Sequence, residues 1–175
     1  ITEYSQPKTF STLSEDGTRL FSDPANCFIV NKAGKYAFEM LKGNSNEPIS
    51  NAVKAEILWE TNNTTTGVSK GNIVSSAEIN ENLVLFNIVE SAEPGNALIA
   101  VKDSEDNILW SWHIWSVDFD PEDSAQIYSN GSVLMDRNLG AISARGGDIG
   151  SLGLMYQWGR KDPFMGGGDF NNTYA

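Results

Sequence analysis

The stretch ILWSWHIW, residues 108–115, contains three of the five tryptophans and the single histidine of this 175-residue chain. Successive side chains of a β-strand point to opposite faces, so residues 108–117 divide into two sets. The first set is apolar throughout and is predicted to lie in a core: Ile108, Trp110, Trp112 and Ile114. The second set mixes polar and aromatic side chains and is predicted to lie on an outer face: Leu109, Ser111, His113, Trp115 and Val117.

Six further apolar or alternating runs lie between residues 27 and 103, separated by turn-rich segments such as NKAGK and SAEPGN. Short strands at this spacing, with no amphipathic helix among them, predict an immunoglobulin-like antiparallel β-sandwich over residues 25–117. The loop DSEDN before the tryptophan-rich stretch predicts that the last two strands form a hairpin. Residues 1–24 are predicted to be an N-terminal extension or an edge strand.

The chain changes character after the sandwich. Residues 118–124, DFDPEDS, are acidic and contain a proline, which predicts a solvated linker. Residues 125–175 predict the beginning of an α+β module, with a strand around residues 132–136. A short helix is expected after an Asp148 cap, because the apolar residues that follow fall at helical spacing: Leu152, Met155 and Tyr156.

This C-terminal module is too small to stand alone. About 50 residues with one short helix cannot easily bury their own apolar side chains. We therefore expect the module to be truncated and to dock on the sandwich, over His113 and Trp115. We also expect the natural protein to continue past Ala175. If the module does not cover them, these two side chains are candidates for binding a ligand.

Composition excludes several classes of function. Twelve basic against 23 acidic side chains give a formal net charge of −11, which disfavours nucleic acid and anionic membranes as partners. One cysteine and one histidine exclude an internal disulfide and a cysteine/histidine zinc site, and Cys27 is expected to be a small buried side chain. No apolar run approaches the roughly 18 residues of a membrane span, and neither glycine-rich segment matches a phosphate-binding loop. No metal, cofactor or membrane span is predicted.

Catalytic motifs are equally missing from the sequence. His113 is the only imidazole available to activate a nucleophile, and no G-x-S-x-G elbow accompanies it. Paired carboxylates for glycoside hydrolysis stay open among the 23 acids, because their separation is spatial and no sequence spacing reports it. We predict no catalytic residues and a protein that is not an enzyme.

A second group of candidate residues lies in MDRNLG, residues 135–140, and QWGRKDP, residues 157–163. One interpretation is a polar pocket that hydrogen-bonds a sugar stacked on Trp158. The favoured alternative is an ion-pair cluster that pins strand to helix, with Trp158 in the core. The charged members are Asp136, Arg137, Arg160, Lys161 and Asp162. The predicted candidates for ligand binding are therefore His113, Trp115, Arg137, Trp158, Arg160 and Asp162.

Several of these segments together carry a family resemblance: ANCFIV and KAGKYAF, AEILWET, GNALIAVKDSEDNILWSWHIW, MDRNLGA and GLMYQWGRKDPF. From Ala25 onward the chain resembles a recurrent block of large Bacteroidetes surface proteins of the fimbrillin-like lipoprotein class. The part after Asp136 also resembles the opening of the Fibrobacter succinogenes major paralogous domain, which is related to C-type-lectin-like folds. Met135, Asn138 and Leu139 match its W-M-x-x-N-L signature, with Leu134 in place of the tryptophan.

The resemblance implies a location and two hypotheses for function. It implies a secreted or outer-surface protein, held through a lipid anchor outside this chain, with other surface proteins or glycans as partners. The first hypothesis is a non-enzymatic module for adhesion, assembly or glycan or protein binding. The alternative is an accessory carbohydrate-binding part of a glycan-degrading enzyme or uptake system.

Overall fold

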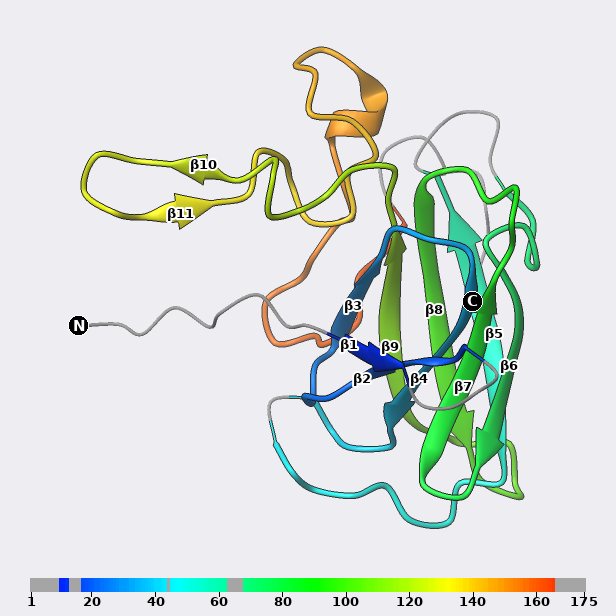
Figure 1. The fold of residues 1–175 in the computed structure, drawn as a ribbon. Coiled ribbons are helices and arrows are strands. Elements are labelled where there is room, and N and C mark those ends of the chain that lie inside the picture. Colours follow the sequence, from blue (N-terminus) through cyan, green and yellow to red (C-terminus); the bar gives the residue numbers. More distant parts are fainter. Residues whose placement is uncertain (1–9, 13–16, 44, 63–67, 166–175) are drawn as a thin grey trace.

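The computed structural model describes residues 10–12, 17–43, 45–62 and 68–165. Two β-sheets face each other and form a mainly β sandwich, as predicted (Figure 1). The five-stranded sheet has the order β1-β2-β4-β7-β6 and the four-stranded sheet the order β3-β9-β8-β5. Their strands are β1 (Phe10–Thr12), β2 (Arg19–Phe21), β3 (Cys27–Val30), β4 (Gly34–Glu39), β5 (Lys54–Thr61), β6 (Val74–Asn80), β7 (Leu83–Ile88), β8 (Gly95–Lys102) and β9 (Ile108–Ser116).

Aromatic side chains from both sheets fill the space between them. The ring centroids of Phe28 and Phe38 lie 4.5 Å apart, and those of Phe38 and Trp112 lie 4.8 Å apart. Tyr36 and Phe86 stack within the five-stranded sheet, with centroids 5.4 Å apart. Each of these rings is almost fully buried, so they dominate the apolar area removed from water.

The sheets are mixed, which corrects the expectation of a purely antiparallel sandwich. The predicted hairpin of β8 and β9 is present, but β9 pairs on its other side with β3 in parallel, and β2 pairs with β4 in parallel. The chain passes from β2 to β3 in the opposite sheet and then back to β4, so β2 and β4 run in the same direction. Apolar runs in a sequence carry no information on this direction. Residues of the predicted N-terminal extension supply β1, which lies at the edge of its sheet.

Strand β9 is buried on both faces from Ser111 to Ser116. Trp112 and Ile114 lie in the core, as predicted, and Trp110 packs at its margin. Ile108 is 53% exposed, so its predicted core position is wrong. The register with β8 shifts between Val101 and Lys102, which interrupts the alternation at this end of β9, and Leu109, predicted for the outer face, packs against the core.

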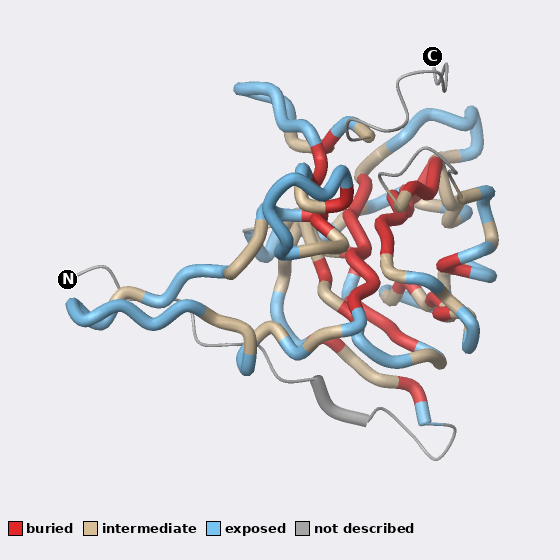
Figure 2. The backbone as a smooth tube through the Cα atoms, turned by 90° about the horizontal axis from the view of Figure 1, so that it is seen from above, coloured by how far each residue is buried: buried red, intermediate tan, exposed pale blue. Residues whose placement is uncertain are grey.

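Residues 118–165, here called the C-terminal segment, cover the second face of β9 with little regular structure. The part of this segment that projects from the sandwich is exposed along most of its length (Figure 2). Strands β10 (Gln126–Ile127) and β11 (Val133–Leu134) form a hairpin that projects from the sandwich (Figure 1). The predicted strand around residues 132–136 is thus present in shorter form.

The predicted helix is absent, which corrects the expectation of an α+β module. Asp148 does cap a turn, because its carboxylate accepts from the backbone N–H of Gly150, but that turn is only the 3-10 helix η1 (Ile149–Ser151). Gly153 then adopts a φ of +71°, and Met155 pairs with Phe164 in an extended bridge. A residue with positive φ ends a right-handed helix, so apolar spacing alone was misleading here.

Trp112→Ala and Trp115→Ala are expected to destabilise different layers. Truncating Trp112 removes the ring that packs on Phe38 in the core and should lower the free energy of unfolding by about 3–5 kcal/mol. Truncating Trp115 should release the C-terminal segment while leaving the sandwich folded. Hydrogen exchange measured by mass spectrometry would separate the two, and equally raised exchange throughout both variants would contradict this division.

Candidate functional site

Three sets of contacts hold the C-terminal segment against the outer face of β9, centred on Ser111, His113 and Trp115. These are alternate residues of one strand, so their side chains point to the same side. His113 is 2% exposed and Trp115 is fully buried. As predicted, residues after 124 dock on the sandwich, but they do so through Asn96 and Ser111. Phe119, from the predicted linker, meets Trp115, so the outer face of β9 is not an open platform.

The first contact joins Ser111 to the motif QWGRKDP. The Ser111 hydroxyl donates to Oδ1 of Asp162 over 2.7 Å. Nζ of Lys161 donates to the Ser111 carbonyl over 2.8 Å and to its hydroxyl over 2.7 Å, and it also forms an ion pair with Asp162. The same ammonium lies 4.7 Å from the centroid of the Trp110 ring. A predicted ligand-binding residue, Asp162, is therefore engaged inside the molecule.

The second contact is a relay of hydrogen bonds that starts at Cys27. Nδ2 of Asn96 donates to the carbonyl of Gly140 over 2.9 Å, so its Oδ1 is left to accept from Nε2 of His113 over 2.8 Å. The imidazole therefore carries its proton on Nε2, and its Nδ1 accepts from the Cys27 thiol over 3.1 Å. The relay links β3, β9 and β8 to the C-terminal segment.

Burial keeps the two ionisable members of this relay, Cys27 and His113, in their neutral forms. Desolvation lowers the pKa of His113 to about 3 and raises the pKa of the Cys27 thiol to about 12. Thiol hydrolases also align cysteine, histidine and asparagine, but their chemistry needs a thiolate and an open approach for substrate. Here the thiol stays protonated, and both His113 and Asn96 are buried. The arrangement favours a structural role. Cys27 was expected to be a small buried side chain, and the structure leaves it partly buried.

The third contact is an aromatic and ionic stack over Trp115. Phe119 meets the Trp115 ring edge-on, with centroids 5.9 Å apart. The guanidinium of Arg137 lies 3.5 Å from the centroid of the Phe119 ring. Nε and Nη2 of Arg137 bind the two oxygens of Asp136 over 2.7 and 2.8 Å, which lowers the pKa of that carboxyl. The acidic linker thus contributes Phe119, which contacts both Trp115 of β9 and Arg137 of the ion pair.

The charged residues predicted to cluster around Trp158 form two separate ion pairs, Asp136 with Arg137 (the Asp136 pair) and Lys161 with Asp162 (the Lys161 pair). The Asp136–Arg137 ion pair contacts Phe119, which packs on Trp115, and the Lys161–Asp162 ion pair contacts Ser111. Ser111 and Trp115 lie about 13 Å apart along the strand. Both ion pairs pin the C-terminal segment to β9, instead of pinning a strand to a helix. Trp158 is fully exposed, so its predicted core position is wrong. Arg160 stacks over Phe164 at 4.0 Å, in contact with neither Trp158 nor the Asp136 pair within the described residues.

Sequence reasoning missed three residues that complete the docking: Asn96, Phe119 and Gly140. Leu154 packs with Leu98 and Trp59 in a second apolar cluster. Gly140 has a φ of +80°, and a Cβ there would lie 2.6 Å from Cγ of Leu154. Asn96 gave the one usable signal, since it is a polar residue opening the apolar run ALIAV.

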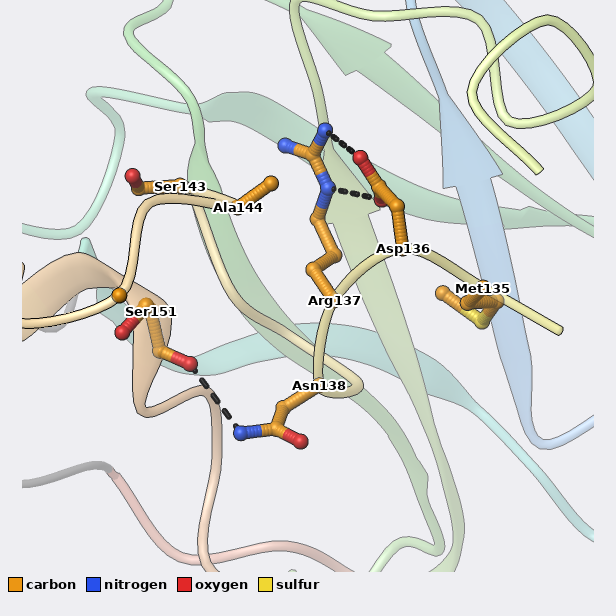
Figure 3. A pocket seen from close by; sticks show the side chains of 8 residues that line it. Met135, Asp136, Arg137, Asn138, Ser143, Ala144 and Ser151 are labelled. Atoms are coloured by element: carbon orange, nitrogen blue, oxygen red, sulfur yellow. Dashed lines mark hydrogen bonds and ion pairs between the residues drawn. The ribbon is translucent and has the colours of Figure 1, made fainter. Parts of the chain in front are cut away.

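A polar cavity opens on the C-terminal segment beside the Asp136 pair (Figure 3). Its volume is about 310 Å³. It is lined by Met135, Asp136, Arg137, Asn138, Ser143, Ala144, Gly146 and Ser151. Of the six predicted ligand-binding residues, Arg137 alone lines this cavity.

No helix in the part of the chain that the structure describes is long and apolar enough to cross a membrane. Across residues 10–12, 17–43, 45–62 and 68–165, no three histidine, cysteine or acidic side chains come together as a metal site. Comparison with protein-family models, with curated proteins and with solved structures gave no match. The immunoglobulin-like type and the fimbrillin-like resemblance therefore stay predictions.

Asp162→Asn is expected to weaken the first contact. The amide cannot neutralise Lys161, whose ammonium is then held near Trp110 without its counter-ion. The free energy of unfolding should fall by about 1–3 kcal/mol in urea denaturation. Arg145→Ala, which removes an exposed charge of the same segment away from the Ser111 contact, is the control. An equal loss in both variants would contradict a specific role for the Ser111 contact.

The buried His113 should make the fold sensitive to acid. Its pKa is about 3 in the folded chain against an ordinary value of 6.5, so below pH 6.5 the unfolded state binds a proton that the folded state does not. Stability should therefore fall by up to about 1.4 kcal/mol per pH unit between pH 6.5 and pH 3. Urea titrations over this range, compared with His113→Gln, measure the contribution. The same slope in the variant would assign the acid sensitivity to other groups.

Proposed function

We propose that this chain is a non-enzymatic module of a bacterial surface protein, for adhesion, assembly or the binding of proteins or glycans. In this proposal the sandwich is a scaffold and the C-terminal segment is the contact surface. One observation carries it. Among the described residues, twelve of the fourteen exposed large apolar side chains lie between Ile127 and Phe164, and the other two are Val53 and Ile108.

This distribution is unusual for a segment that also contributes to a core. Exposed apolar side chains gathered in one region mark interaction surfaces more often than scattered ones do. The β10–β11 hairpin, residues 126–134, has no charged residue in a chain of net charge −11. Ile127 is 79% exposed beside its register partner Val133, and Leu134 is 53% exposed. A partner approaching this hairpin meets apolar surface without charge repulsion.

Trp158 supports the alternative of an accessory carbohydrate-binding part. Its indole is fully exposed in a turn next to Gly159, which has a φ of +79°. An exposed indole offers a flat apolar face with a polar N–H at its edge, which suits stacking of a sugar ring. The outer-surface location and the lipid anchor remain part of the proposal through the family resemblance.

Substitutions on the hairpin test the proposed contact surface. I127S/V133S/L134S should abolish capture of protein partners from an outer-membrane extract. The matched control is V53S/I108S, which removes the two exposed apolar side chains outside the C-terminal segment. Loss of capture in the control alone, or hydrolysis of any glycan or peptide by the unaltered chain, would overturn the proposal.

A further inference from the structure

We propose that the cavity beside Arg137 binds a single neutral, hydroxyl-rich sugar residue. The inference rests on the proposed function as a binding module and adds the class of ligand and its place. It is independent of the apolar hairpin, which lies outside the cavity lining.

The cavity is built around a fixed guanidinium. The Arg137 side chain is 10% exposed, and it is held from two directions by Phe119 and by both oxygens of Asp136. Its third nitrogen, Nη1, makes no hydrogen bond within the described residues. Figure 3 shows this nitrogen on the side of the guanidinium toward Ser143 and Ala144. A donor held in place before binding loses little conformational entropy when a ligand arrives.

Two further polar side chains of the lining are held by hydrogen bonds. Nδ2 of Asn138 donates to the carbonyls of Ser151 and Leu152, which fixes its amide at the edge of the cavity (Figure 3). The Ser143 oxygen accepts from the backbone N–H of Arg145 over 3.1 Å, which leaves its hydroxyl proton to donate. Each hydroxyl of a sugar both donates and accepts, and this mixture of groups matches that requirement.

Charge and volume narrow the ligand class. Asp136 neutralises Arg137, and every other lining residue is uncharged. The net charge of −11 also disfavours anions such as phosphate or an acidic sugar. A volume of about 310 Å³ is at the lower end for ligand pockets, which suits one sugar ring more than an extended oligosaccharide. A ligand of this size should bind with a Kd on the order of 1 mM.

Titration of the isotope-labelled chain with methyl glycosides of neutral hexoses and N-acetylhexosamines tests this inference by NMR. The backbone amides of Asn138, Ala144 and Gly146 should shift with saturation in the millimolar range. Ala144→Leu fills the cavity from an exposed position and should weaken binding at least tenfold, with the rest of the spectrum unchanged. Arg145→Ala, a neighbour outside the cavity lining, is the control and should bind normally.

Parallel titrations use sialic acid and inorganic phosphate. The sugar proposal is overturned if only these anions shift the cavity amides, if neutral sugars shift amides elsewhere, if Ala144→Leu binds as well as the parent, or if no sugar gives a response. Each of these results leaves capture through the hairpin to be judged by its own variants, so the two proposals fail separately.

Discussion

Burial of β9 on both faces is the constraint on which the rest of the structure depends. One face carries Trp112 and Ile114 and needs the five-stranded sheet. The other carries His113 and Trp115, which no second sheet covers. The irregular C-terminal segment covers this face instead. It places polar groups against β9, where a packed sheet would have placed apolar side chains. The C-terminal segment therefore takes the place of a second covering sheet on the outer face of β9.

Polar residues on a buried strand face explain the chemistry of the docking contacts. A buried hydroxyl or imidazole without a partner costs free energy, so Ser111 and His113 each require a specific group from elsewhere in the chain. Lys161 with Asp162, and Asn96, supply those groups. Asp162 and His113, which the sequence suggested as ligand-binding residues, thus form hydrogen bonds within the protein itself. Arg137 differs, because one of its nitrogens faces the cavity instead.

Much of the sandwich was predictable, because apolar alternation reports which residues are buried in strands. The strands from β3 to β9 and the final hairpin follow from it. The direction of the strands could not be predicted, since the parallel pairs depend on the order in which the chain passes from one sheet to the other. The prediction of a helix after Asp148 was wrong because Gly153 adopts a positive φ, which the spacing of apolar residues does not reveal. The predicted core position of Trp158 was wrong because a large apolar side chain was assumed to be buried, whereas the turn that carries Trp158 leaves it exposed to solvent.

The parallel pairing of β3 with β9 also dictates an order of assembly. Cys27 and His113 are 86 positions apart in sequence, so this edge of the sheet closes only after most of the sandwich has been made. Contacts of such long range slow folding. During synthesis from the N-terminus, the indole of Trp115 then stays bare until Phe119 and the residues after it emerge. A nascent chain in that interval exposes an apolar sheet face to solvent, which makes it prone to aggregate.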